Sequence, residues 1–148
     1  MADRHGPTRG NRFIVEVDGV EVSGSRRVEL PSRTTDVGEY REGDEPDHEK
    51  KLWGQTEFGT LTVERSIQAE DSMFFDWAEQ VRTGDLDGGR KQCEVTLQDE
   101  GGAPKVRWTF ENAWIQHYEP PTLDVDNEDP VGEMAVIAFD KMVREYEG

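Results

Sequence analysis

Histidines and acidic residues are the side chains of this sequence that could bind a metal or transfer protons. The three histidines, His5, His48 and His117, lie far apart, and the glutamate after His48 lacks the second histidine of a helical zinc site. The acidic run Asp124–Asp129 resembles a calcium loop. It has no glycine at its sixth position, and its twelfth position is Ala135 instead of a bidentate glutamate. We therefore expect a solvated acidic loop and no metal site.

Other catalytic signatures do not occur in the sequence. It contains no GxSxG, no phosphate-binding glycine loop and no CxxC. The single Cys93 cannot pair within the chain and lies in the apolar register of a strand, which favours a small core side chain. With so many carboxylates, chance acid pairs are certain and indicate no catalytic dyad. We predict no catalytic residue, no cofactor and no enzyme activity.

The charge balance is unusual for a chain of this size. Asp and Glu number 33 against 17 Lys and Arg, a net charge of −16, whereas a small domain usually carries a magnitude of about 2–8. The acid could repel nucleic acid, bind basic partners, or reflect a high-salt host, and the scarcity of lysine favours the last. The sequence has no Lys/Arg cluster that could neutralise phosphates, so direct nucleic-acid binding is not expected.

The length of 148 residues fits one domain with one core. Residues 1–11 form a polar N-terminal arm without the apolar run of a signal peptide, and no apolar stretch approaches the roughly 18 residues of a membrane helix. We expect synthesis in the cytoplasm and no stable membrane insertion.

Alternating apolar residues predict a mainly β fold. Phe13–Val17 and Val20–Val22 flank Asp18-Gly19, a strong hairpin signal, and Arg26–Leu30 offers a third strand. Three later strands have one apolar and one polar face. These strands comprise residues 61–64, 92–98 and 105–111, and a turn at residues 99–104 joins the last two.

One amphipathic helix is predicted over about residues 71–83. Met73, Phe74, Trp77 and Val81 fall on one face of a helix, and Gly84 can end it. The expected fold is a small antiparallel β-barrel or sandwich with this one flanking helix.

Two segments predict contacts with other copies of the chain. Residues 38–58 show no clear period beyond a possible short strand at their start, so we expect a long loop whose aromatic side chains dock on their own domain or on a neighbour. The expected last strand, Glu133–Val143, is apolar on both faces, and a two-layer domain can bury only one of them. The second face must therefore meet a loop, the helix or another subunit, and we favour another subunit.

The sequence resembles the tail-tube proteins of contractile phages and extracellular injection systems. The resemblance runs in order over nearly the whole chain and includes the specific block EYREG…KLWGQT. The matching stretches are Phe13–Val22, Glu39–Ser66, Phe74–Gly84, Val95–Asp124 and Glu133–Val143.

The resemblance implies a structural subunit that forms hexameric rings, stacked inside a contractile sheath into a conduit driven through a target envelope. The implied partners are further copies, sheath protein, baseplate or spike-hub proteins and tube-terminating proteins, with protein cargo or DNA in the lumen. The expected location is a phage tail-like particle or virion, which could be released from the cell. The resemblance and the two segments above together give the expected interface residues Tyr40, Arg41, Glu42, Asp47, Lys51, Leu52, Trp53, Gln55, Met134 and Val136.

Polar strand faces are candidates for the channel wall, although they could equally be ordinary wet faces of a sheet. The candidate lumen-facing residues are Thr60, Thr62, Glu64, Gln92, Glu94 and Thr96. Two rival functions remain at this point. One is a phage or archaeal-virus tail tube that conducts DNA, and the other is a monomeric acidic β-domain that binds a small ligand or a basic protein.

Overall fold

The protein is described from a computed structural model, which places residues 9–10, 12–40, 50–129 and 131–146. Strands dominate it, and every pairing between them is antiparallel. The strands are β1 (Phe13–Val17), β2 (Val20–Glu21), β3 (Ser25–Glu29), β4 (Arg33–Tyr40), β5 (Lys50–Phe58), β6 (Leu61–Ser66), β7 (Lys91–Gln98), β8 (Pro104–Glu119), β9 (Gly132–Ala138) and β10 (Lys141–Tyr146). The predicted mainly β, antiparallel class is confirmed.

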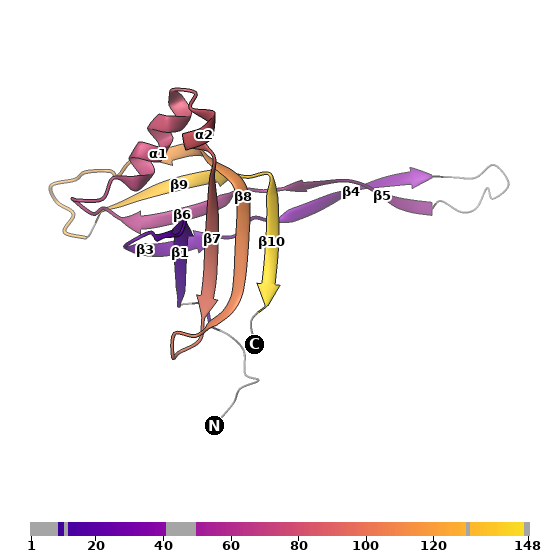
Figure 1. Cartoon of the computed structure of the whole chain (residues 1–148), viewed down its shortest axis with the longest axis horizontal. Coiled ribbons are helices and arrows are strands. Elements are labelled where there is room, and N and C mark those ends of the chain that lie inside the picture. The colour runs from indigo at the N-terminus through magenta and orange to yellow at the C-terminus, as the bar shows by residue number, and fades with distance from the viewer. Residues whose placement is uncertain (1–8, 11, 41–49, 130, 147–148) are drawn as a thin grey trace.

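One bent sheet forms the body of the molecule. Its order is β2-β1-β7-β8-β9-β6-β3, and β10 also pairs with β8. The first half of β8 pairs with β7 and β10, and its second half pairs with β9. Strands β1, β7 and β10 therefore cross the direction of β3, β6 and β9 (Figure 1). The inward residues of both halves form one core, which includes Val15, Val63 and Phe110.

The predicted β1–β2 hairpin is present. Its two turn residues have positive φ, 50° at Asp18 and 82° at Gly19, as a two-residue hairpin turn of the primed type requires. The Asp18 carboxylate also accepts a hydrogen bond of 2.9 Å from the backbone N–H of Gln92, which ties this turn to β7.

The predicted helix is α1 (Met73–Arg82), and it covers one end of the body. Phe74 and Trp77 are buried beneath it, and the Asp71 carboxylate accepts a hydrogen bond from the N–H of Met73 at its start. A short second helix, α2 (Leu86–Gly89), was not predicted. The Trp77 indole donates a 2.7 Å hydrogen bond to the Gly89 carbonyl and so holds α2 against α1.

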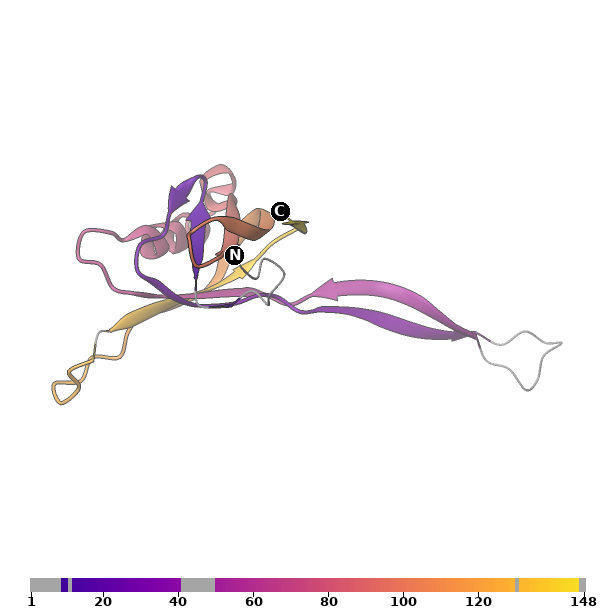
Figure 2. The same ribbon diagram turned by 90° about the horizontal axis from the view of Figure 1, so that it is seen from below.

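The expected loop over residues 38–58 is wrong for the residues that the structure describes. Strands β4 and β5 pair along their length into a two-stranded ribbon that projects from the body, hereafter the β-arm (Figures 1 and 2). No other described strand pairs with it. Both of its faces are exposed. Neither strand therefore needs an apolar face, and the alternation of apolar and polar residues that usually indicates a strand is missing from the sequence.

The expected last strand is also corrected, because it is interrupted at Phe139 and Asp140. Strand β9 pairs with the second half of β8, and β10 pairs with the first half. The chain must therefore turn where β8 bends, and the N–H of Asp140 bonds to the carbonyl of Glu111 at that point. Asn112, with φ of 53°, marks the bend in β8 itself.

Candidate inter-subunit surfaces

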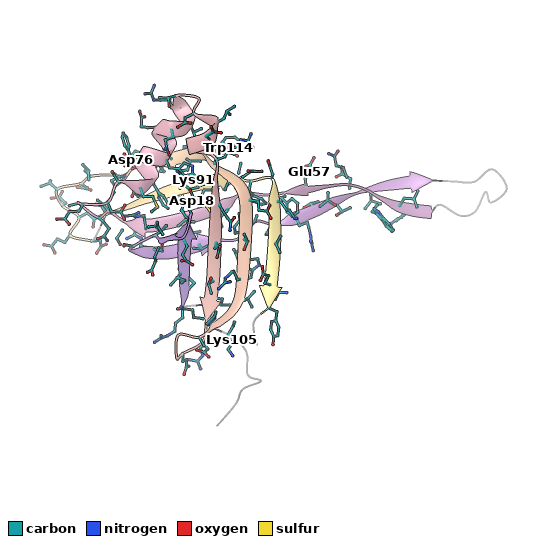
Figure 3. The ribbon with its side chains drawn as sticks, viewed as in Figure 1. Asp18, Glu57, Asp76, Lys91, Lys105 and Trp114 are labelled. Atoms are coloured by element: carbon teal, nitrogen blue, oxygen red, sulfur yellow. The ribbon has the colours of Figure 1, made fainter. Side chains whose placement is uncertain are left out.

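The β-arm brings two of the predicted interface residues onto one surface. Val37 and Trp53 are direct cross-strand partners, and alternation along β5 places Lys51 on the same face as Trp53. We call this the Trp53 face. Trp53 is 84% exposed and Val37 is 66% exposed. Figure 3 shows side chains standing off both sides of the ribbon, with Glu57 pointing into open space.

The remaining predicted residues of this segment do not gather on that face. Leu52 pairs with Gly38 on the opposite face of the β-arm and is 53% exposed. Gln55 is exposed and lies where the register of the ribbon shifts, so alternation from Trp53 does not fix its face. Tyr40 is the last residue of β4. The other three, which lie outside the described residues, are Arg41, Glu42 and Asp47.

The base of the β-arm is fixed to the body by aromatic side chains. The centres of the Phe58 and Phe139 rings lie 5.7 Å apart, and those of the Phe139 and Phe110 rings lie 5.0 Å apart. Phe110 belongs to the core. The N–H of Gly59 also donates to the Ser32 carbonyl at 2.8 Å. Beyond this base the ribbon has no covering layer among the described residues. Since an isolated two-stranded ribbon is marginally stable in water, the β-arm is suited to a surface of another molecule.

The residues of β6 and β9 that were predicted to line the channel or to form an interface lie on a single surface. Thr62 pairs directly with Val136, and Glu64 pairs with Met134, so expected channel residues and expected interface residues share one sheet face. All four side chains are partly exposed. The Glu64 carboxylate lies 2.9 Å from the Nε atom of Arg26, which adds a charged contact beside this face.

Not all the expected channel residues are available to solvent. Gln92 is exposed, while Thr60 and Glu94 are partly exposed, and the Glu94 carboxylate lies 3.7 Å from Arg107 Nε. Thr96 is only 3% exposed, so its assignment to a channel wall is corrected. It lies on β7 between strands β1 and β8, and its register partners there, Ile14 and Arg107, are both larger than threonine.

A loop at the other end of the molecule is the second exposed surface. Residues 120–129, which connect β8 toward β9, form the acidic loop. It presents Leu123, 77% exposed, and Val125, 98% exposed, among acidic side chains. The N–H of Asp126 bonds to the Asp124 carboxylate at 3.0 Å, so the loop makes turns of its own.

A buried ionic cluster was not predicted from the sequence. Arg65 is fully buried, and its Nη2 lies 3.0 Å from Asp71 Oδ2. Its Nε lies 3.5 Å from Glu133 Oε2, and its guanidinium carbon lies 5.4 Å from the centre of the Phe74 ring. The Tyr118 hydroxyl donates a 2.5 Å hydrogen bond to Glu133 Oε1. The cluster joins β6, β8 and β9 to the start of α1.

The protonation of the cluster follows from these contacts. Burial acts to raise the pKa of Asp71, but the hydrogen bond from Met73 and the Arg65 guanidinium together outweigh it and lower that pKa. Burial, together with the hydrogen bond to Glu133, raises the pKa of Tyr118 to about 12. These shifts favour the charged form of Asp71 and the protonated form of Tyr118, which suits a structural link better than proton transfer.

A signal for the cluster existed in the sequence. Arg65 continues the inward register of Leu61 and Val63 along β6, and Glu133 continues that of Ala135 and Ile137 along β9. A charged residue at an inward position of each strand indicates a buried pair, because a lone buried charge is severely destabilising.

Features of a metal site or of a membrane span do not occur in the placed residues. They contain no group of three or more His, Cys, Asp or Glu arranged to hold a metal ion. Among the helices of the described chain, none has the length and apolar character needed to cross a bilayer. Cys93 is fully buried, and burial, aided by the negative charge of Asp18, raises the pKa of its thiol to about 12.

Comparison with known proteins gives one family and several similar structures. Residues 9–143 match the family model of the T4-like virus tail tube protein gp19. A comparison with proteins of curated function gave no match.

Similar folds occur in several solved structures. A chain of the sheath-tube complex of the extracellular contractile injection system PVC, in its extended state, has a TM-score of 0.85 and 20% identity over 97% of this chain and 95% of that chain. A chain from the tube-terminating cap of the anti-feeding prophage has a TM-score of 0.85 and 18% identity, covering 99% of this chain and 96% of that one. Hcp1 from Flavobacterium johnsoniae is less similar, with a TM-score of 0.56 and 18% identity, covering 91% of this chain and 95% of that one. At these identities the likeness is one of fold.

Proposed function

The chain belongs to the T4-like virus tail tube protein family, and on this premise we propose that it is the inner-tube subunit of a contractile injection system. Six copies would form a ring, and rings would stack inside a contractile sheath into a passive conduit. The observation that carries the proposal is the β-arm, a two-stranded ribbon exposed on both faces that an isolated monomer has no evident use for.

The proposed partners are further copies, a sheath protein, a baseplate or spike hub and a tube terminator. Support comes from the similar structures, which are described as a sheath-tube complex, a baseplate and a cap. We place synthesis and assembly in the cytoplasm and the mature protein in a tail-like particle. Protein cargo is the proposed content of the lumen.

The work of penetration would come from the sheath, so the tube subunit needs rigidity and no catalytic site.

A second candidate, a virus tail that conducts DNA, is favoured by one observation, since the matching family model is that of a virus tail tube protein. Electron microscopy of the protein expressed alone and with its neighbouring genes tests both. Hollow rods inside a sheath support the tube function, and a capsid on the particles assigns it to a virus. A protein that stays monomeric under all assembly conditions would contradict both.

The β-arm should be required for assembly and dispensable for folding. Thr35 and Thr56 are direct partners at 2.8 Å between their hydroxyls, so Asn-Gly can replace residues 36–55 as a two-residue turn. We expect the shortened chain to keep the circular dichroism spectrum and cooperative melting of the body and to form no rods. Rods of normal length from this variant would contradict a role for the β-arm in assembly.

Assembly should also depend on salt. Six copies of a chain of charge −16 would gather a formal charge of −96 in each ring. The Debye length is about 30 Å at 0.01 M salt and about 3 Å at 1 M, so repulsion between rings is screened only at high salt. We expect rods in molar KCl and dissociation on dilution, measured by sedimentation across a salt series.

The same series examines the proposal of a halophilic host, because excess like charge also opposes the compact state of a single chain. The melting temperature of the unassembled domain should rise with salt. Rods that persist unchanged from millimolar to molar salt would mean that the acidic groups are neutralised locally, and the high-salt explanation would then fail.

A further inference from the structure

We infer that the Trp53 face of the β-arm in one copy docks on the acidic loop of the next copy, with Val37 and Trp53 packed against Leu123 and Val125. This inference rests on the proposed function, because it requires copies that assemble. It deepens that function by naming the two surfaces that meet.

The apolar side chains of the two surfaces supply the first argument. Trp53 is 84% exposed and Val37 66%, while Val125 is 98% exposed and Leu123 77%. All four stand on segments that project from the body, so no other part of the described chain covers them. Burying side chains of this size against one another removes apolar surface from water, which is the main favourable term in most protein associations.

Charge supplies the second argument. The two aliphatic side chains of the loop lie among four acidic residues, which are Asp124, Asp126, Glu128 and Asp129. In a chain of net charge −16, most surfaces of a neighbouring copy would repel this loop. The Trp53 face repels it less, because Lys51 lies beside the tryptophan and its register partner Glu39 leaves this cross-strand pair with no net charge. Lys51 is one of only five lysines in the sequence.

The positions of the two surfaces supply the third argument. The β-arm and the acidic loop lie at opposite ends of the long axis in both views (Figures 1 and 2), so they cannot meet within one chain. Repeated head to tail, such a contact generates closed rings or open stacks. A two-fold pair, in which each β-arm lies on the acidic loop of the other copy, would instead stop at two chains.

Disulfide trapping tests the pairing directly. We would express Trp53→Cys/Val125→Cys and, separately, Val37→Cys/Leu123→Cys, assemble the full chain in molar KCl, and add a mild oxidant. Cys93 can stay, because it is fully buried and its pKa is raised to about 12. On a non-reducing gel we expect ladders of covalently linked chains from at least one variant. A ladder that ends at six would place the contact within a ring, and an open ladder would place it between rings.

The controls separate this inference from the proposed function. The variant Trp53→Cys/Leu86→Cys pairs the β-arm with a side chain of similar exposure on α2, 72%, and should stay unlinked. If both test variants assemble into rods but stay single chains, or if the control links as readily, the docking is wrong although the tube function stands. If the unmodified protein forms no rods, the proposed function itself fails.

Charge reversal gives an independent measurement. Lys51→Glu should raise the concentration needed for assembly by about two- to five-fold at moderate salt, the range of an exposed ion pair. Adding Asp124→Lys should restore assembly if the two residues meet, because the pair is then reversed instead of removed. Restoration supports the docking, whereas a second loss that adds to the first would contradict it.

Discussion

Replacing Glu133 with leucine should destabilise the unassembled domain by about 3–5 kcal/mol, the usual cost of removing one partner of a buried ion pair. Glu133 is 3% exposed and faces Arg65, which is fully buried. Without this carboxylate the guanidinium keeps only Asp71 as a charged partner among the described residues, and the Tyr118 hydroxyl loses its acceptor. Urea unfolding followed by tryptophan fluorescence measures the change.

The double variant Arg65→Met/Glu133→Leu distinguishes a buried-charge effect from lost packing. It removes both charges and keeps apolar volume, and such replacements are often neutral or stabilising by about 1–4 kcal/mol relative to the ion pair. Asp71 would remain ionised, because its side chain is 30% exposed and still accepts from the backbone N–H that follows it. Glu29→Leu, which removes an exposed pair with Arg27, should change stability by less than about 1 kcal/mol. A double variant as unstable as the single one would contradict the explanation.

The second large effect is expected from aspartate at two adjacent positions of β9. Ile137 is 1% exposed and pairs with Leu61 in the core, so Ile137→Asp places an unpaired charge there. We expect a loss of more than about 4 kcal/mol and an unfolded chain, since many domains have only about 5–15 kcal/mol in total.

Val136→Asp is the matched variant, because its side chain lies on the opposite, partly exposed face beside Thr62. This chain should fold with a normal melting curve and fail to assemble if the face contacts a neighbour. Circular dichroism and electron microscopy measure the two properties separately. Val136→Asp that unfolds like Ile137→Asp would contradict the assignment of the faces, and rods from Val136→Asp would show that this face is not an interface.

The parts of the fold that were predicted correctly are those with one buried face. The β1–β2 hairpin, the amphipathic helix α1 and the strands β7 and β8 each alternate between water and core, so hydrophobic periodicity marks them. The β9–β10 break was missed for a different reason. It depends on where β8 bends, which is a property of the assembled sheet and has no local signature in residues 133–143.

The surfaces were predicted less well than the fold. Lys51 and Trp53 do share a face, but the expected loop hid this, because a ribbon exposed on both sides has no hydrophobic period. Thr96 was misplaced since strand alternation gives the direction of a side chain and not the size of its neighbours. Arg65 and Glu133 were overlooked although each continues the inward register of its strand, because the expected last strand is apolar on both faces and only the pairing of β6 with β9 shows which face is inward.

The length of β8 has a mechanical consequence for a protein that is pushed. Its 16 residues follow a path of about 50 Å that bends at Asn112, and hydrogen bonds run along it to β7 and β10 in one half and to β9 in the other. A load applied along either half is shared by many hydrogen bonds in parallel, so they must fail together. A load across that half would open them one at a time. Because the two halves point in different directions, one continuous strand should stiffen the domain along both of them.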